Sequence, residues 1–412
     1  MHSRPVSERA RALSGIGWAR GALAAIVAFV GASTLAPSVA NTLKRADPAM
    51  AHTLASWDGR LTAARAKQLF VGTSRADAGA PSSVLAREAL MQDATAVDAL
   101  TILAFQAQLR GEAAASDRYH SVINQLTRRE MSTNIWAIEE AVGRGDIAAA
   151  LYGYDLTLRI SNDASQILFP TLASAVNEPA VRSRLLKTLT GRPPWLDPFL
   201  SFAAERGPYP LATRALFLAA DEAGLKTSDA QWAALVTALL KGGYAAEAWE
   251  YFVTRRAGAQ RTASRDDDFA ALPLTRAPFD WQASNDPSLS AAIMRSERGG
   301  ALEFEVANGG AGVIATQWQV LLPGTYRLEA VTSGISQQPR SQPYFTLTCS
   351  SGRDLGKIPV AQSASEDDKT TGTFLVPQGC AVQELSLVAR PVDDMDGLAG
   401  KVHRISLRRN EP

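Results

Sequence analysis

Two cysteines are the residues whose possible chemistry is easiest to define. Cys349 and Cys380 are the only cysteines of the 412-residue chain, and both lie at the edges of segments predicted to be strands. No histidine lies near them in the sequence and there is no C-x-x-C motif, so a metal site is not indicated. We predict a disulfide, worth about 3.5–4 kcal/mol on the chain-entropy model; two free buried thiols are the alternative.

Aromatic side chains in the last third of the chain are the other candidates. Trp281, Trp318, Tyr326 and Tyr344 could stack on sugar rings, as exposed aromatic faces do in flat glycan sites. Trp318 and Tyr326 alternate in phase with apolar neighbours, which favours core packing for both. Trp281 and Tyr344 lie next to predicted loops, so we take these two as candidate ligand contacts.

Catalytic constellations are not found in the sequence. It contains no G-x-S-x-G elbow, no P-loop and no H-E-x-x-H motif. The run Asp393-Asp394-Met395-Asp396-Gly397 begins like a calcium loop, but it lacks the alternating oxygen ligands and the distal glutamate, so a solvated turn is the better interpretation. We predict a protein that is not an enzyme and that uses no metal or cofactor.

An uncharged segment near the N-terminus places the rest of the chain relative to a membrane. Residues 21–40 would span about 30 Å as a helix, the thickness of a bilayer core. Residues 1–20 carry an excess of arginine, which predicts a cytoplasmic tail. We predict a single-pass inner-membrane protein whose bulk is periplasmic. Ser38-Val39-Ala40 is also a credible cleavage site, so the alternatives are a cleaved signal peptide with a soluble periplasmic protein, or a buried helix.

The middle of the chain, residues 50–260, has the periodicity of helices. Leu100, Leu103, Ala104 and Ala107 follow the i, i+3, i+4, i+7 spacing of one helix face. Gly111-Glu112 and Gly145-Asp146 lie 34 residues apart. This predicts an all-α repeat domain of about eight to eleven helices, interrupted around residues 191–198.

Part of this region resembles the tetratricopeptide repeat. The stretch GRGDIAAALYGYDLTL resembles the second half of a repeat unit, and KGGYAAEAWEYF has the same spacing. The resemblance implies a turn glycine, a small residue at a close helix crossing and an aromatic residue between units, which are Gly145, Ala150 and Tyr154 in the first stretch and Gly243, Ala248 and Phe252 in the second. It also implies a surface that docks a protein partner; a plain helical spacer is the alternative.

The composition changes after Ala263. The charged run 265–268 and the prolines at 273 and 278 predict a linker over residues 261–278. Short alternating segments follow, such as Leu302, Phe304 and Val306, separated by glycine and proline. They predict an all-β sandwich over residues 279–412.

This C-terminal domain resembles the jelly rolls of galactose-binding-like carbohydrate-binding modules. The resemblance rests on VLLPGTYRLEAVTSG, with its turn at Pro323-Gly324 and a core strand from Tyr326, and on the entry segment Pro278-Phe279-Asp280-Trp281. The layout of the whole chain is similar to that of membrane-anchored tetratricopeptide proteins associated with surface-polysaccharide production in Gram-negative bacteria.

These features narrow the functional hypotheses to three. The formal net charge of +1 provides no global basic field, so nucleic-acid binding is set aside. The first hypothesis is a non-catalytic envelope scaffold whose helical repeats dock a protein partner in polysaccharide assembly or export. The alternative is a glycan-binding protein that uses the β-sandwich, and the third is a carbohydrate-active enzyme with an unrecognised site.

Overall fold

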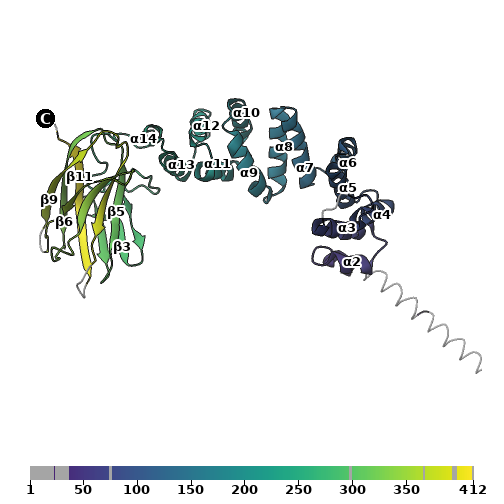
Figure 1. Ribbon diagram of the computed structural model, residues 1–412, viewed down its shortest axis with the longest axis horizontal. Helices are drawn as coiled ribbons and strands as arrows, with labels where there is room; N and C mark the ends of the chain where they lie inside the picture. Colours follow the sequence, from purple (N-terminus) through teal and green to yellow (C-terminus); the bar gives the residue numbers. More distant parts are fainter. Residues whose placement is uncertain are drawn as a thin grey trace, which may run out of the picture. The chain divides into compact units, whose positions relative to one another are not determined.

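A computed structural model describes residues 23, 37–73, 77–296, 299–364, 367–391 and 397–410. The chain divides into two compact units between Asn162 and Asp163, and each is described by itself. The first unit is helical, and the second contains helices followed by a β-sandwich (Figure 1). The predicted combination of an α-helical region and a C-terminal β-sandwich is therefore confirmed.

The first unit consists of short helices that pack through alanine. Asp47 caps the first of them by accepting a hydrogen bond from the backbone N–H of Met50 at 3.0 Å. Buried alanines such as Ala66, Ala89 and Ala99 lie where neighbouring helices meet, because only a small side chain permits that approach. The helices are α2 (Pro48–Leu54), α3 (Gly59–Thr73), α4 (Pro81–Gln92), α5 (Val97–Leu109), α6 (Ala113–Leu126), α7 (Met131–Gly143) and α8 (Ile147–Ile160).

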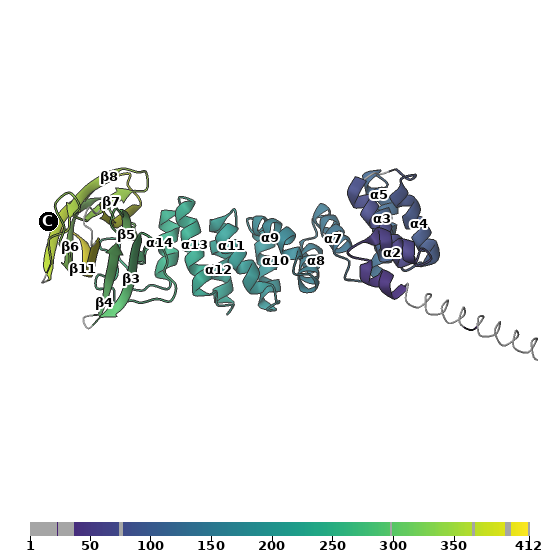
Figure 2. The same ribbon diagram turned by 90° about the horizontal axis from the view of Figure 1, so that it is seen from below.

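The second unit begins with six helices that bury larger side chains. Phe199, Phe217 and Trp232 are each completely enclosed. A capping box at Ser228 and Gln231 starts the helix that carries Trp232. The helices are α9 (Ala164–Ala175), α10 (Pro179–Thr190), α11 (Leu196–Arg206), α12 (Pro210–Glu222), α13 (Asp229–Lys241) and α14 (Ala245–Val253) (Figure 2).

The helices are more numerous than the sequence led us to expect. Thirteen helices, α2 to α14, lie over residues 48–253, where about eight to eleven were predicted for residues 50–260. Several prolines that interrupt the apolar pattern occupy the first turn of a new helix, where their missing N–H costs nothing; examples are Pro81, Pro179 and Pro210. The interruption predicted at 191–198 covers the connection between α10 and α11, residues 191–195, and the first three residues of α11.

The two glycines predicted as turns adopt the left-handed conformation. Gly145 has φ +70°, and the next residue, Asp146, donates its N–H to the carbonyl of Ala141 at 2.8 Å. Gly243 has φ +83° and the same pattern of bonds, with Tyr244 donating to Leu239 at 2.9 Å. Both are helix ends of the Schellman type, which favour glycine. The other predicted residues, Ala150, Tyr154, Ala248 and Phe252, are buried.

Two antiparallel sheets form the sandwich around one apolar core. The five-stranded sheet has the order β1-β5-β10-β7-β8, and the six-stranded sheet has the order β2-β3-β4-β11-β6-β9. Leu328, Phe345, Leu387 and Ile405 are among the fully buried residues between them. The strands are β1 (Gln282–Ala283), β2 (Asn285–Asp286), β3 (Leu289–Ser296), β4 (Gly299–Val306), β5 (Gly312–Gln319), β6 (Gly324–Ser333), β7 (Tyr344–Cys349), β8 (Asp354–Pro359), β9 (Asp368–Val376), β10 (Gln383–Ala389) and β11 (Leu398–Arg409).

The segment 261–278, predicted as a linker, is packed against the sandwich. Ser264 donates its N–H to the carbonyl of Leu407 at 2.7 Å and accepts from the Leu407 N–H on its hydroxyl at 2.8 Å. Phe269 is fully buried in the sandwich core. Phe269 directly follows the charged run 265–268, so its burial is not evident from the sequence. The prediction of a linker is therefore wrong for this part of the segment.

The predicted membrane segment cannot be compared with the structure. Most of residues 21–40 and the tail 1–20 lie outside the described residues. Within the part of the chain that is described, no helix has both the length and the apolar character needed to cross a membrane. Anchor and cleaved signal peptide therefore both stay predictions.

Candidate functional site

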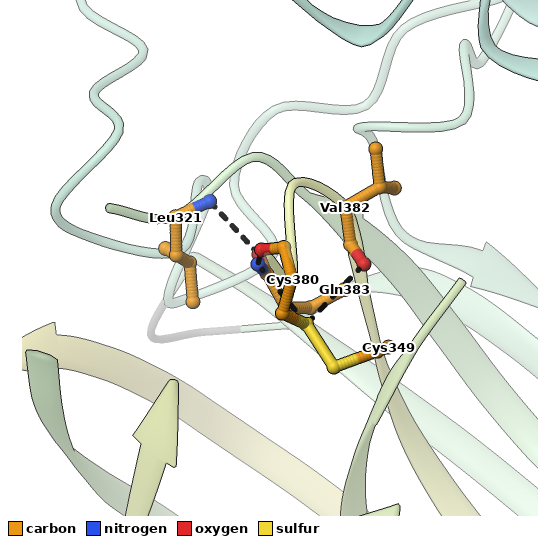
Figure 3. Close-up of a disulfide and its surroundings, with 5 residues drawn as sticks. All are labelled: Leu321, Cys349, Cys380, Val382 and Gln383. Atoms are coloured by element: carbon orange, nitrogen blue, oxygen red, sulfur yellow. Dashed lines mark hydrogen bonds between the residues drawn. A yellow bond between two sulfur atoms is a disulfide. The ribbon is translucent and has the colours of Figure 1, made fainter. Parts of the chain in front are cut away.

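Cys349 and Cys380 form a disulfide, as predicted. Their sulfur atoms are 2.07 Å apart and their Cα atoms 5.6 Å apart (Figure 3). Beside the bridge, the side-chain oxygen of Gln383 accepts the N–H of Leu321 at 2.9 Å, and its amide nitrogen donates to the carbonyl of Cys380. The bridge and this glutamine together fix the loop before β10 to the end of β7 and to the segment after β5.

Trp281 does not lie in a ligand site. Only 1% of it is exposed, and its ring packs against Phe269 at 5.6 Å in the core of the sandwich. The sequence interpretation of Trp281 as a ligand contact is therefore wrong. The two residues before it in the chain, Phe279 and Asp280, are also buried.

Trp318, which was predicted to pack in the core, lies on the outer face of the five-stranded sheet. Its neighbour Gln317 is buried and pairs with Leu385, which faces the core. Successive side chains in a strand point to opposite faces, so Trp318 points outward, and it is half-buried there. The sequence suggested core packing for Trp318, and that prediction is wrong. The side chains of Gln317 and Gln319 face the core instead, so Trp318 between them faces outward.

Cross-strand pairing extends this outer face from Trp318 on β5 over two more strands, β10 and β7. Trp318 lies opposite Glu384, and Glu384 lies opposite Thr348. The next row runs from Thr316 through Ser386 to Thr346. We call this surface the β5–β10–β7 face, and its members are Thr316, Trp318, Tyr344, Thr346, Thr348, Glu384 and Ser386.

Hydrogen bonds hold the polar side chains in the middle of the β5–β10–β7 face in position. The hydroxyl of Thr316 donates to Glu384 Oε1 at 2.8 Å and lies 3.3 Å from the hydroxyl of Ser386. On the neighbouring strand, the Thr346 hydroxyl donates to the Gly356 carbonyl at 3.0 Å. The face therefore presents hydroxyl and carboxylate groups in fixed positions on a rigid sheet.

Tyr344, the second predicted contact, lies on the same face. It is half-buried, and both the Lys357 ammonium and the Arg390 guanidinium lie 5.1 Å from the centre of its ring. Lys357 is also 3.8 Å from Asp354. The structure thus places Tyr344 on the same sheet face as Trp318, which the sequence had assigned to the core, whereas Trp281 lies in the core.

Strand geometry places these two aromatic residues at opposite corners of the face. They lie two strands apart, and Glu384 and Val388, their partners on β10, are four residues apart. With strand spacings of 4.8 Å and a rise of 3.3 Å, the corners are roughly 16 Å apart. Such a face suits an extended ligand with apolar and hydroxyl-bearing surfaces better than a single small molecule.

The residues that the structure describes form no cluster of metal ligands. Among these residues, no group of three histidine, cysteine, aspartate or glutamate side chains is placed to hold an ion. The acidic run at 393–396, weighed above as a calcium loop, lies outside the described residues.

Comparison with known proteins gives structural likenesses only. No family model matches the chain, and no curated protein matches it. The CBM22-1 xylan-binding domain from Paenibacillus barcinonensis Xyn10C is similar over 38% of this chain and 99% of its own, at 11% identity and a TM-score of 0.28. The C-terminal CBM6 of LamC from Zobellia galactanivorans is similar over 32% of this chain and 100% of its own, at 14% identity and a TM-score of 0.21.

A phage protein shows a likeness of the same extent. The enzymatically active domain of tailspike protein 4 from bacteriophage CBA120 is similar over 32% of this chain at 10% identity, with a TM-score of 0.25. The chain covers only 19% of that domain. All three TM-scores lie below 0.5, so these likenesses support no conclusion about a ligand or an activity of this chain.

Proposed function

We propose that this protein binds a neutral polysaccharide chain along the β5–β10–β7 face. The observation that carries the proposal is the position of Trp318 and Tyr344, two half-buried aromatic residues at opposite corners of one outer sheet face. A sugar ring has an apolar face that stacks on an aromatic side chain and a rim of hydroxyls that needs hydrogen-bonding partners. The face offers both kinds of group on a surface long enough for several sugar units.

The polar row between the aromatic corners provides the hydrogen bonds of the proposal. Glu384 accepts the Thr316 hydroxyl through one oxygen only, so its other oxygen is a candidate acceptor for a sugar hydroxyl. Thr348 lies directly across from Glu384 and is half-buried. Because these groups are held by central strands of a sheet, little conformational entropy is lost when a ligand binds.

The rest of the chain has a supporting role in this proposal. We place the protein in the bacterial envelope, non-catalytic and anchored through residues 21–40, with a jelly-roll sandwich and tetratricopeptide-like hairpins that act as a spacer or dock a protein partner in polysaccharide assembly. The disulfide between Cys349 and Cys380 supports an oxidising compartment, where such bonds persist. The β5–β10–β7 face favours glycan binding over the purely scaffolding function expected first.

Affinity electrophoresis of the full-length chain tests the proposal. Gels containing xylan, mixed-linkage β-glucan or galactomannan should retard the wild-type protein in at least one case. Trp318→Ala should abolish the retardation, whereas Trp57→Ala should preserve it, since Trp57 is 63% exposed in the loop between α2 and α3, outside the sandwich. Equal retardation of both variants, or no retardation of the wild type in any gel, would contradict the proposal.

A further inference from the structure

The other sheet of the sandwich carries a groove rich in arginine. The groove lies over β6 and β11 on the outer face of the six-stranded sheet and has a volume of about 1260 Å³. Among the residues that the structure describes, four arginines and one carboxylate, that of Glu329, contribute to its lining. We call it the arginine groove; its arginines are Arg327, Arg404, Arg408 and Arg409.

Two of these arginines face each other across the sheet. Arg327 on β6 is the direct cross-strand partner of Arg408 on β11. Their side chains are 54% and 65% exposed. Like charges in directly opposite positions destabilise an antiparallel pair, and a carboxylate at either position would remove the repulsion. The fold does not need this arrangement, and such a local cost is typical of a functional position.

The charged residues that the structure describes neutralise the positive charge of the groove only in part. Glu329 pairs with Arg327 and with Lys369 on β9, each at 2.9 Å, so this one carboxylate serves two cations. The hydrogen bond from Lys369 lowers the pKa of Glu329, which therefore stays ionised at neutral pH. The groove keeps an excess of positive charge even with Glu329 fully charged.

The three arginines of the groove on β11 also have few carboxylate partners among the described residues. Asp267 accepts a hydrogen bond from Arg408 at 2.8 Å and also lies 3.9 Å from Arg404. Arg409 donates to the backbone carbonyl of Pro323 at 3.1 Å and has no carboxylate partner among the described residues. The guanidinium of Arg409 lies so close to Gly324 that a Cβ there would be 2.9 Å from its Nε.

The lining of the groove indicates the class of ligand. The described residues of the lining include no aromatic side chain on which the bases of a nucleic acid could stack, and no large apolar side chain that could enter a bilayer. Gln260, Thr262 and Asn410 add amide and hydroxyl groups beside the guanidinium groups. Guanidinium groups bind carboxylates with paired hydrogen bonds, and amides and hydroxyls suit sugar hydroxyls.

We propose that the arginine groove is a second binding site, which takes an acidic polysaccharide through the carboxylates of its uronate units. The groove lies on the sheet opposite to the β5–β10–β7 face and shares no residue with it. This site therefore goes beyond the proposed function, and either one can fail without the other.

The test uses two probes that share one sugar backbone and differ in whether their carboxyl groups are charged or methyl-esterified. Full-length protein is titrated with polygalacturonate and with its fully methyl-esterified form at low salt. Binding is expected for polygalacturonate alone, and added salt should weaken it because the guanidinium groups are exposed. Arg327→Gln/Arg408→Gln should weaken it by about tenfold or more, and Arg404→Gln should weaken it by a smaller factor. Equal binding of both probes, or no binding of polygalacturonate, would overturn the proposal.

A matched control removes the same charge elsewhere. Arg184→Gln/Arg206→Gln changes two exposed arginines of α10 and α11 and should leave binding of polygalacturonate unchanged. The groove variant removes the repulsion between Arg327 and Arg408, but it also removes their ion pairs with Glu329 and Asp267. Circular dichroism should therefore first show that the groove variant and this control have the same fold. If the groove variant binds polygalacturonate as well as the control does, the arginine groove is not the binding site. If phosphatidylglycerol vesicles or a single-stranded DNA oligonucleotide bind in the groove in place of polygalacturonate, the ligand class is wrong.

Discussion

The carboxylate of Asp280 accepts a hydrogen bond from the guanidinium of Arg265, and only 3% of the Asp280 side chain is exposed. Asp280 lies also 3.5 Å from the guanidinium of Arg256, which stacks over the Trp232 ring of α13 at 4.7 Å. The preceding residue, Phe279, packs edge-on against Phe252 of α14 at 5.0 Å. The entry segment of the sandwich is thus joined to the last helical hairpin by a buried charged and aromatic cluster.

Asp280→Asn should destabilise this cluster strongly. The change leaves two largely buried guanidinium groups without their counter-charge, and breaking a buried pair of this kind costs about 3 kcal/mol or more. The measurement is the free energy of unfolding from urea titration. Asp229→Asn is the control: Asp229 pairs with Arg255 at 2.9 Å, but its side chain is 59% exposed, so the loss should stay below about 1 kcal/mol. Similar losses for the two variants would show that Asp280 does not join helices and sandwich.

Removal of the disulfide should destabilise the sandwich. Cys349 and Cys380 are 31 residues apart, and closing a loop of that length is worth about 3.5–4 kcal/mol on the chain-entropy model. Cys349→Ala/Cys380→Ala should therefore lower the unfolding free energy by about that amount, and dithiothreitol should lower that of the wild type but not that of the variant. An unchanged wild-type unfolding curve in dithiothreitol would contradict the prediction.

His120 should make the first unit sensitive to acid. Its ring is fully buried, stacked on Trp136 at 4.3 Å, with Nδ1 3.0 Å from the Thr133 hydroxyl. Burial lowers the pKa of His120, an effect that nearby Asp117 partly offsets. The unfolded chain therefore binds a proton at His120 more readily than the folded protein does. Above about pH 6.5 this difference costs no stability, and the free energy of unfolding falls as the pH drops from there toward the lowered pKa.

The measurement for His120 is hydrogen exchange of the α6 amides between pH 7 and pH 5. After correction for the intrinsic exchange rate, wild-type protection should fall with decreasing pH. His120→Gln retains a polar group near Thr133 but cannot titrate, so its protection should depend less on pH. Identical pH dependence in the two proteins would exclude His120 as the cause.

Alanine at two nearby glycines should have opposite effects. Gly145 has φ +70°, so Gly145→Ala should cost about 1 kcal/mol or more. Gly143 is the last residue of α7, and Gly143→Ala should stabilise by about 0.5 kcal/mol through the unfolded state. A Cβ would meet nothing within 4 Å at either position, so backbone conformation alone distinguishes them. Thermal unfolding gives both values, and a stable Gly145→Ala protein would contradict the turn assignment.

The sequence predicted local features well and long-range packing poorly. The turn glycines, the cysteine pair and the alternating strands follow from short patterns, and the structure agrees with each of them. Trp318 was misassigned because the amide of Gln317 is satisfied by the carbonyl of Arg265 at 2.8 Å, a contact between residues 52 positions apart. No local pattern shows that such a glutamine can be buried.

The same reasoning explains Trp281 and the segment before it. Trp281 lies beside a loop in sequence, which suggested exposure. The segment 261–278 returns to the sandwich, however, and its buried Phe269 contacts the Trp281 ring. The arginine groove was also not predicted, because Arg327 and Arg408 become neighbours only through the pairing of β6 with β11.

Calorimetric titration of the full-length protein with oligosaccharides of the polymer retarded in affinity gels tests glycan binding most directly. Trp318→Ala/Tyr344→Ala should lose detectable binding because both aromatic corners of the β5–β10–β7 face are removed. Trp57→Ala/Tyr152→Ala removes two exposed aromatic residues, 63% and 64% exposed, from the helical region and should bind like the wild type. Equal binding by the two double variants would contradict a glycan site on this face.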